Sequence, residues 1–457
     1  MSAKPRALVL GGGVAGLRAA FGLADRGYQV TLCEARQHCG GRAFSFADAA
    51  SGQRLDNGPH ALLGCYRAMG ALLQRLGTAG HCQRDATLKL AYRHPGGRCD
   101  RLQLGGWPVP LAMPSALLRL GLPFGAKLRA LFGMATALLP TPAHWTLADW
   151  LQRRGQSGLP DDVLWRPLCR AIMNCEPDAC AARDFLATLR EAFAGRAAQA
   201  AFVLPTAPWG VLLGDAAPAA LARAGVALRL GARATGLLVG ERFVSAVEFG
   251  DGTRCALAAD DLLVTALPWF ALHRLCPALW PGAGALRSAP IVTAHFEVAE
   301  RAAVLPDQGP VVALVGGAPF HFVLRTPGGE PRRFALLSGG DRWFDGRSVA
   351  EIEGAARAEL GRYYPEWAAE VPARVRIAKE QHATFVAAPG SRPLRPRPGR
   401  LVGGPANLLV CGDWTDTGLP ATLEGAARSA EALLAGCRGA ERGRAGSHCR
   451  QCPPQQR

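Results

Sequence analysis

The sequence predicts an α/β protein: a Rossmann-like, mostly parallel sheet with helices on its faces, interleaved with a second region of α+β character. Three observations predict this class. An apolar run at 7–10 has the composition of a buried strand, glycines in G-x-G-x-x-G spacing follow it at once, and a helical pattern from 17 to 25 leads to a second apolar run at 29–33.

The glycines of the first turn predict a dinucleotide site. Gly11 permits the tight turn, Gly13 lets backbone approach a pyrophosphate, and Gly16 lets the helix pack closely on the strand. Val14 and Ala15 lie between them, at the positive end of the helix, which favours phosphate groups.

The second strand ends in an acidic residue, as this kind of site requires. Glu34 follows the run at 29–33 and is placed to accept hydrogen bonds from ribose hydroxyls, and Ala35 comes next. A glycine-rich turn in some other α/β protein is the alternative, and the strand–turn–helix–strand context disfavours it.

The middle of the chain alternates between helical and strand-like character. Residues 65–77 have apolar residues at helical spacing, and 78–105 read as short strands. Helices are predicted within 107–140 and 146–203. Strands are predicted at 227–230, 234–239, 244–249, 262–266 and 290–298.

The last part of the chain is predicted to alternate between strand and helix twice more. Residues 333–338 alternate like a strand and 348–361 fit a helix. A buried strand over 407–411 is followed by a helix over 422–434, and the polar residues 438–457 are predicted to be a disordered tail.

These changes of character predict an interleaved domain organisation. Two domains alternate along the chain before the tail, and the expected segments are 1–77, 205–268 and 385–437 for the nucleotide-binding domain and 78–204 and 269–384 for the substrate domain.

Composition narrows the classes of function. The chain has 457 residues and a net charge of +16, yet no dense basic run interleaved with aromatic residues, so we expect no nucleic-acid partner. The excess of Arg has two interpretations, the base composition of the genome or attraction to anionic lipid. No window reaches about 18 uninterrupted apolar residues, and no signal peptide is evident, so we expect no spanning helix. The 14 Cys are expected to be reduced thiols, with no metal site.

Two more segments are predicted to meet the same cofactor. Gly40 and Gly41 allow close backbone approach, and Arg42 supplies a cation. Gly412 and Asp413 follow the late strand. The helix that begins near Thr422 can direct backbone N–H groups toward negative charge.

These motifs carry a family resemblance. Glu34-Ala-Arg-x-x-x-Gly-Gly-Arg42 resembles the second fingerprint of FAD-dependent amine oxidases and carotenoid-type desaturases. The ending from Gly412 to Ser429, with Asp56-Asn-Gly-Pro-His60 and Leu164-Trp-Arg-Pro-Leu168, is most similar to the squalene-associated FAD-dependent desaturase (hydroxysqualene dehydroxylase) family, over about residues 6–435. The resemblance implies a Rossmann-like FAD-binding domain of the GR2 type.

The resemblance also implies roles for single residues of the cofactor site. Gly11, Gly13 and Gly16 would hold the pyrophosphate, Glu34 the adenosine ribose, and the backbone at Ala234 the adenine. The flavin side would be met by residues of three segments: Gly41, Arg42, Gly58, Pro59, His60, Gly412, Asp413, Thr422 and Leu423. Pro59 stands where the family usually has Gln, and Ala234 where it usually has Val.

His60 has two interpretations. The family places its loop beside the flavin, and an imidazole with an ordinary pKa titrates near neutral pH, which suits a proton donor. A structural His bound to backbone is the alternative. Asp56 is expected to be a turn or cap residue rather than a catalyst.

Residues 107–140 also have two interpretations. Their apolar side chains would form a hydrophobic entry that dips into a lipid leaflet, with Arg119, Lys127 and Arg129 at the headgroups, or they would form an ordinary helical core.

The resemblance implies an FAD-dependent enzyme of C30 isoprenoid biosynthesis. The expected reaction is reductive dehydroxylation of hydroxysqualene to squalene by hydride from reduced flavin, with an external electron donor that the sequence does not identify. A desaturase that removes hydride to FAD is the alternative, a flavin amine oxidase is third, and a lipid-binding chaperone is the non-enzyme hypothesis. We expect a cytoplasmic protein attached peripherally to the inner face of a bacterial cytoplasmic membrane.

Overall fold

A six-stranded sheet carries the glycine turn. The computed structural model describes residues 4–49, 51–298, 309, 311–328, 332–370 and 375–437, so the predicted tail at 438–457 lies outside the described residues. The order of this sheet is β10 (Ala227–Arg229), β2 (Gln29–Cys33), β1 (Arg6–Leu10), β14 (Leu262–Thr265), β21 (Leu408–Val410) and β20 (Gly399–Arg400). All pairings are parallel except that of β20 with β21, which confirms the predicted fold class.

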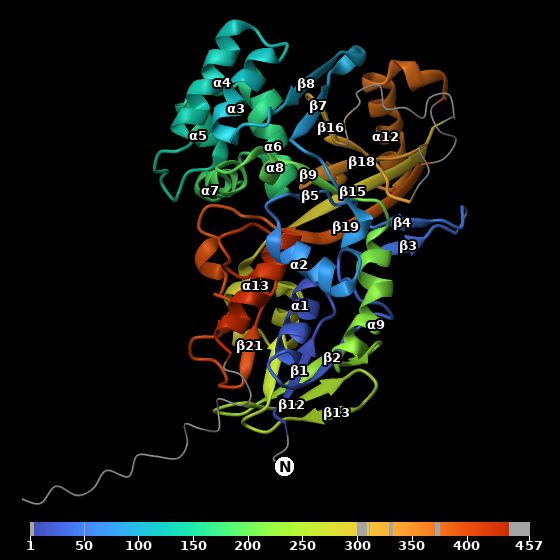
Figure 1. Ribbon diagram of the computed structural model, residues 1–457, viewed down its shortest axis with the longest axis vertical. Helices are drawn as coiled ribbons and strands as arrows, with labels where there is room; N and C mark the ends of the chain where they lie inside the picture. The colour runs from blue at the N-terminus through green and yellow to red at the C-terminus, as the bar shows by residue number, and fades with distance from the viewer. Residues whose placement is uncertain are drawn as a thin grey trace, which may run out of the picture.

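Helices α1 (Val14–Ala24) and α13 (Leu423–Ala435) pack against each other beside this sheet. A Cβ on Gly22 would lie 2.2 Å from a methyl carbon of Leu434, so the two helices approach as closely as a glycine allows. Helices α2 (Arg67–Leu76) and α9 (Ala216–Arg223) complete the same apolar core. The helix that begins at Thr422 is therefore fixed next to the helix that begins at the glycine turn (Figure 1).

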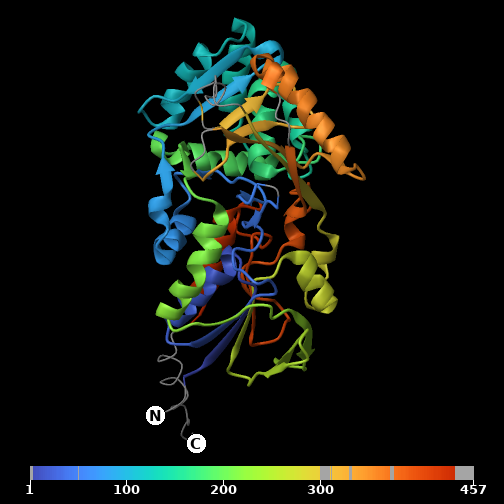
Figure 2. The same cartoon turned by 90° about the vertical axis from the view of Figure 1, so that its right-hand side faces the viewer.

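A seven-stranded sheet lies at the other end of the molecule (Figure 2). Its order is β19 (Val375–Phe385), β15 (Ser288–Glu297), β18 (Arg333–Gly339), β17 (Phe322–Arg325), β16 (Val311–Leu314), β7 (Lys89–Arg93) and β8 (Cys99–Gln103). Helix α12 (Val349–Tyr363) covers one face through a core that includes Phe334, Ile352 and Leu360.

Short helices form a layer beyond the seven-stranded sheet, at the upper left of Figure 1. They are α3 (Val109–Arg119), α4 (Phe124–Thr136), α5 (Leu147–Arg153), α6 (Arg166–Met173), α7 (Ala182–Phe193) and α8 (Ala197–Ala200). No helix among the described residues is long and apolar enough to cross a membrane.

Smaller sheets complete the fold. They are β11 (Ala234–Val239), β12 (Val244–Phe249) and β13 (Arg254–Ala256); β5 (Leu62–Leu63), β9 (Phe202–Pro205) and β6 (Cys82–Arg84); and β3 (Ser45–Ala47) with β4 (Arg54–Asp56). The strands of the six-stranded sheet come from residues 1–77, 205–268 and 385–437, as an interleaved organisation requires. The domain boundaries themselves stay a prediction.

Candidate functional site

The glycine turn has room for backbone only. Gly11 has φ +102, and a Cβ on Gly16 would lie 1.8 Å from the carbonyl oxygen of Gly11. Gly13 is the N-cap residue of α1 and Val14 and Ala15 are its first residues, so the free N–H groups of the helix start lie at this turn. The local geometry is that of a phosphate cradle.

The second glycine pair lies directly on the first turn. Gly41 has φ +62, and a Cβ there would lie 3.0 Å from the Cα of Gly13. The N–H of Gly40 donates to the carbonyl of Gly12 at 2.9 Å. The structure thus brings Gly13 and Gly41 into contact, as the sequence predicted for a shared site.

Glu34 is buried at the end of β2, beside the glycine turn. Its Oε2 accepts from the N–H of Gly12 at 2.6 Å, and its Oε1 accepts from the N–H of Arg36 at 2.8 Å. A carboxylate offers about four lone-pair positions, so Glu34 can still accept from hydroxyl groups.

The chain near Ala234 also approaches the end of β2. The N–H of Ala232 donates to the carbonyl of Glu34 at 2.8 Å, and Ala234 begins β11, where it pairs with Phe249. Ala35 lies between these backbone contacts. The predicted adenine and ribose contacts are therefore neighbours in the structure.

Arg42 and Asp413 form an ion pair that joins two of the predicted segments. Their Nη2 and Oδ1 atoms are 2.6 Å apart, and the carboxylate is buried. The Nη1 of Arg42 donates to the carbonyl of Ala383 at 2.7 Å, and the guanidinium lies over the ring of Trp269. The charge of Arg42 is thus partly balanced by Asp413, which the sequence did not indicate.

The C-terminal motif is shaped by a glycine at positive φ and a helix cap. Gly412 has φ +143 and donates its N–H to Ser429 Oγ at 2.8 Å. Thr422 Oγ1 accepts from the N–H of Gly425 at 2.9 Å and caps α13, whose first residue is Leu423. The remaining N–H groups of this helix start can face an anionic group.

Arg395 holds the loop between Gly412 and Thr422. No sequence pattern indicates this role. Its side chain is buried and donates to the carbonyls of Trp414, Thr415 and Leu419. The residue lies in an Arg- and Pro-rich stretch with no pattern of its own. Only the clustering of glycine, threonine and proline at 412–422 could have suggested that this loop needs a buried donor.

The loop at 56–60 is fixed by Asp56. Its Oδ1 accepts from Ser45 Oγ at 2.6 Å and from the N–H of Trp209 at 2.8 Å. Burial raises the pKa of Asp56 to about 6. These contacts are those of a structural carboxylate, in agreement with the expectation for Asp56. Gly58 and Pro59 are buried, and a Cβ on Gly58 would lie 3.7 Å from side-chain atoms of Ile291 and Thr293 on β15.

His60 lies near Arg42. Burial lowers the pKa of His60 to about 4, a bond with the Gly58 backbone opposes the shift, and the charge of Arg42 adds to it. Its ring meets the edge of Trp209, and Nδ1 has no hydrogen-bond partner among the described residues. The ordinary imidazole pKa assumed from the sequence therefore does not hold in the folded protein.

The residues present fit FAD. Gly13 and Gly41 leave a cradle that a Cβ would narrow, and a buried carboxylate lies beside it. Helix α13 packs against α1, the helix that begins at this cradle, and its Ser429 accepts from the N–H of Gly412. These features supply backbone donors for a pyrophosphate and an acceptor for a ribose. The individual contacts remain predictions.

Comparisons with known proteins support a flavin-dependent family. Residues 14–433 match the family model described as flavin containing amine oxidoreductase. The chain is similar to the hydroxysqualene dehydroxylase of Rhodopseudomonas palustris, 31% identical over 92% of this chain and 95% of that one. It is also similar to the hydroxysqualene dehydroxylase of Sinorhizobium fredii, 30% identical over 92% and 95%, and to the 15-cis-phytoene desaturase of Synechococcus elongatus, 24% identical over 94% and 96%.

Solved structures show the same fold. Cyclohexylamine oxidase from Brevibacterium oxydans superposes with a TM-score of 0.70 at 16% identity, covering 96% of this chain and 99% of that one. The chain is an oxidoreductase with FAD as its cofactor. It belongs to the family of flavin-containing amine oxidoreductases, in the branch of its hydroxysqualene dehydroxylase relatives.

Proposed function

We propose that the protein converts hydroxysqualene to squalene by reductive dehydroxylation. The observation that carries this proposal is the 31% identity to a named hydroxysqualene dehydroxylase over 92% of the chain. The hydroxyl leaves as water with one proton, and the carbon that carried it gains a hydride. Bound FAD in its reduced form supplies that hydride.

The chain's own residues bind and orient in this proposal. The glycine turns at Gly13 and Gly41 and the capped start of α13 fix the cofactor at separate points. Arg42 pairs with Asp413 and donates to the backbone of Ala383, so it holds the segments around Gly41 and Asp413 in fixed relative positions. Fixed orientation and exclusion of water are what a hydride transfer needs from the protein.

We propose that His60 donates the proton with which the hydroxyl group leaves. Because the pKa of His60 is lowered to about 4, its charged form is scarce at neutral pH. The rate of a single turnover should therefore rise as pH falls from 8 to 5. A His60→Ala variant that keeps the single-turnover rate of the wild type would remove His60 from the reaction.

The direction of the reaction is tested by product analysis. Photoreduced protein is incubated anaerobically with hydroxysqualene, and oxidised protein is incubated in parallel with squalene and with phytoene. The proposal predicts newly formed squalene, by mass, in the first sample and unchanged substrate in the two parallel samples. New double bonds in the parallel samples would favour the desaturase alternative, which the 24% identity to a phytoene desaturase keeps open.

An amine oxidase has less support. The sequence argument for that class depends on a lysine near the flavin, and Lys379 is the only one in the second half of the chain. Its Nζ donates to the carbonyl of Phe344, next to α12, at 2.6 Å.

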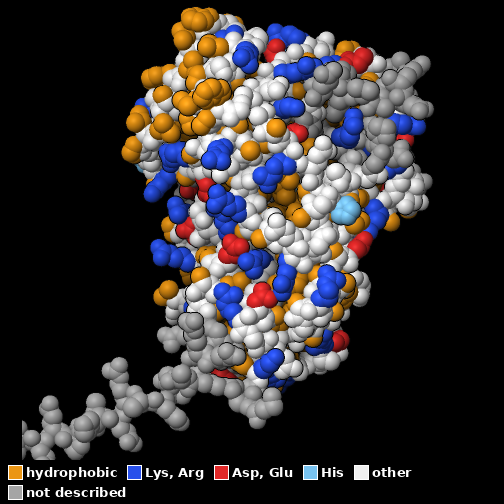
Figure 3. Space-filling view, in the orientation of Figure 1, with side chains coloured by type: hydrophobic (Ala, Val, Ile, Leu, Met, Phe, Trp, Pro, Cys, Tyr) orange, Lys and Arg blue, Asp and Glu red, His pale blue; other side chains and the backbone are white. Residues whose placement is uncertain are grey.

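We also propose that α3 and α4 dock on an anionic membrane, from which the substrate is collected. Eight large apolar side chains of this region are exposed: Trp107, Leu111, Leu118, Phe124, Leu128, Phe132, Leu138 and Leu139. Apolar side chains gather over these helices in Figure 3. Such a patch marks an interaction surface rather than an ordinary solvated face.

The charges of the same region fit a lipid surface. Between Asp100 and Asp149 the sequence has no acidic residue, while Arg119, Lys127 and Arg129 lie on or beside the two helices. Other side chains of the helices, among them Met113, Leu117 and Ala130, are buried in the core. Part of the segment 107–140 is thus an ordinary helical core and part is an exposed apolar face. The exposed face supports the membrane proposal.

A further inference from the structure

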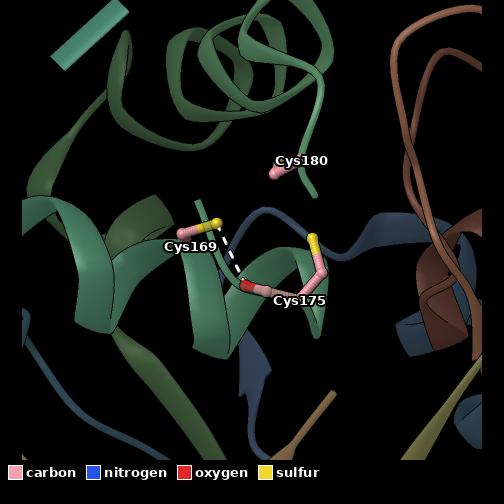
Figure 4. A group of neighbouring side chains, drawn as sticks. All are labelled: Cys169, Cys175 and Cys180. Carbon is pink, nitrogen blue, oxygen red and sulfur yellow. Dashed lines mark hydrogen bonds between the residues drawn. The ribbon is translucent and has the colours of Figure 1, made fainter. Parts of the chain in front are cut away.

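Three cysteines that the proposed reaction does not use lie together in the helical layer. Cys169 is on α6, Cys175 follows the end of that helix, and Cys180 precedes α7. All three are buried, and each Sγ lies within 4.8 Å of the other two. Figure 4 shows Cys169 and Cys175 linked by a hydrogen bond from the thiol of Cys169 to the carbonyl of Cys175, at 3.2 Å, with Cys180 on the facing segment.

The backbone around the cluster is held in place at several points. Asn174 adopts a left-handed conformation with φ 51 and donates to Thr384 Oγ1 at 2.7 Å. The carbonyl of Cys180 accepts from Leu147 at 2.7 Å, and the next N–H, of Ala181, donates to Ala387 at 2.7 Å. The backbone that carries the three cysteines is therefore held by elements that are far apart in the sequence.

Close packing against β18 adds to this rigidity. A Cβ on Gly340, which directly follows that strand, would lie 2.2 Å from the carbonyl oxygen of Asn174 and 2.9 Å from the Cα of Cys175. The turn that carries Cys175 thus has no space in which to shift. A rigid backbone around the ligands is what a selective metal site requires.

We propose that Cys169, Cys175 and Cys180 form a closed site for one monovalent thiophilic cation, Cu⁺. Metal–sulfur bonds of about 2.3 Å in a trigonal arrangement place sulfur atoms about 4 Å apart, which small side-chain rotations can reach from the present separations. Cu⁺ is favoured because thiolates are soft ligands.

The number of ligands distinguishes Cu⁺ from other ions. Structural zinc takes four ligands and iron–sulfur clusters take four cysteines, but the described residues of this group offer three. Binding releases the protons of the three thiols to solvent, because cysteine ligates a metal as the thiolate.

Metal content of the purified holoenzyme tests the site. All variants are built on a Cys449→Ser/Cys452→Ser background, because these two residues lie close together in the sequence and offer thiols of their own. Cells are grown in copper-supplemented medium, and copper and zinc are measured relative to bound FAD. We expect one copper per FAD in the background protein and in the control variants Cys255→Ser and Cys276→Ser. Copper should fall to less than one fifth in Cys169→Ser, Cys175→Ser and Cys180→Ser.

X-ray absorption on the background protein keeps the test independent of how the variants fold. Three sulfur neighbours around Cu⁺ are the predicted result. Absence of copper, one zinc in its place, a coordination shell without three sulfurs, or equal loss of copper in the control variants would each overturn the proposal. None of these readouts depends on dehydroxylation, so the site and the proposed function can fail separately.

Discussion

At the scale of single residues, the cofactor cradle depends on the absence of side chains. Gly16 is the sharpest case, since its missing Cβ makes room for the carbonyl oxygen of Gly11. Gly70 in α2 is a useful contrast, because a Cβ there would meet nothing within 4 Å. Replacement of glycine by alanine should therefore have opposite effects on stability at Gly16 and at Gly70.

Gly16→Ala is expected to destabilise the protein by about 3 kcal/mol or more and to abolish FAD retention, because the new methyl group forces the turn apart. Gly70→Ala should instead stabilise the protein by roughly 0.5–1 kcal/mol, with unchanged FAD content. Urea unfolding and the flavin-to-protein absorbance ratio measure both effects. A Gly16→Ala protein that is purified yellow would contradict the cradle described above.

His295 gives a residue-level prediction of pH dependence. Burial lowers its pKa to about 4, and its Nε2 bonds to the carbonyl of Asp56 at 2.9 Å. The unfolded chain binds this proton near the ordinary pKa of about 6.5. Between about pH 6.5 and 4 the unfolded state therefore binds more protons, and His295 lowers stability as pH falls through that window.

The variant His295→Asn keeps a donor and removes the titration. From pH 7 to pH 5 it should lose on the order of 1–2 kcal/mol less stability than the wild type. The pKa of Asp56 is raised to about 6, so Asp56 adds stability as pH falls. It does so in the wild type and in the variant alike, and the difference between their pH dependences of stability therefore reports His295 alone. Identical slopes of unfolding free energy against pH would contradict the assignment.

At the scale of elements, α13 is tied to α2 by one buried carboxylate. Glu424 in the first turn of α13 accepts from the N–H groups of Arg67, Ala68 and Met69 at the start of α2. It thus satisfies donors that a helix start leaves free. Helix α13, which lies in the C-terminal flavin motif, is anchored to α2 through this contact.

Glu424→Ala should lower the free energy of unfolding by about 1–3 kcal/mol, since two buried donors and one part-buried donor lose their acceptor. Glu431→Ala on the same helix is the control. Its carboxylate is 40% exposed and pairs with Arg18, so the cost should stay within about 1 kcal/mol. Equal costs in thermal unfolding would show that the cap does not anchor α13.

The α3–α4 pair carries the prediction about membranes. Phe124, Leu128 and Phe132 recur on one exposed face of α4 and are 69%, 49% and 58% exposed. Replacing all three by Ser should weaken binding to phosphatidylglycerol vesicles at least about tenfold, because each side chain contributes apolar burial in the leaflet. Co-sedimentation measures the change.

The control double variant replaces Val349 and Val402 by Ser, since both are exposed but lie away from α3 and α4. It should bind vesicles as the wild type does. Equal losses in the two variants, or no binding of the wild type at low salt, would rule out this docking face.

At the scale of the whole molecule, the site exists because separate stretches of chain return to one sheet. β1, β14 and β21 are neighbours in the six-stranded sheet although about 250 and 150 residues lie between them. The glycine turn after β1 and Asp413 after β21 thereby lie at the same end of the sheet as Glu34, which follows β2. Loss of any of these strands would remove one side of the site.

The sequence predicted the parts of this arrangement that have local signals. The glycine turn, β2 with Glu34, and the strand–helix unit at β21 and α13 each have a pattern of their own. β19 was missed because Arg376, Lys379 and Glu380 interrupt its alternation, as is common in an edge strand. The pairing of β16 with β7 joins segments more than 200 residues apart, and local patterns do not encode it.

Side-chain contacts were the least predictable from the sequence. The ion pair of Arg42 with Asp413, the capping role of Glu424 and the proximity of the three cysteines all depend on tertiary structure. The pKa of His60 depends on it too, since burial is its main determinant.

One single-turnover experiment tests the central claim most directly. Reduced protein is mixed anaerobically with an equal amount of hydroxysqualene, and flavin absorbance and squalene are followed in the same sample. We predict that one squalene forms for each flavin reoxidised, along a single time course. Flavin that stays reduced while the substrate is bound, or that reoxidises without squalene, would contradict the assignment of this protein as a dehydroxylase.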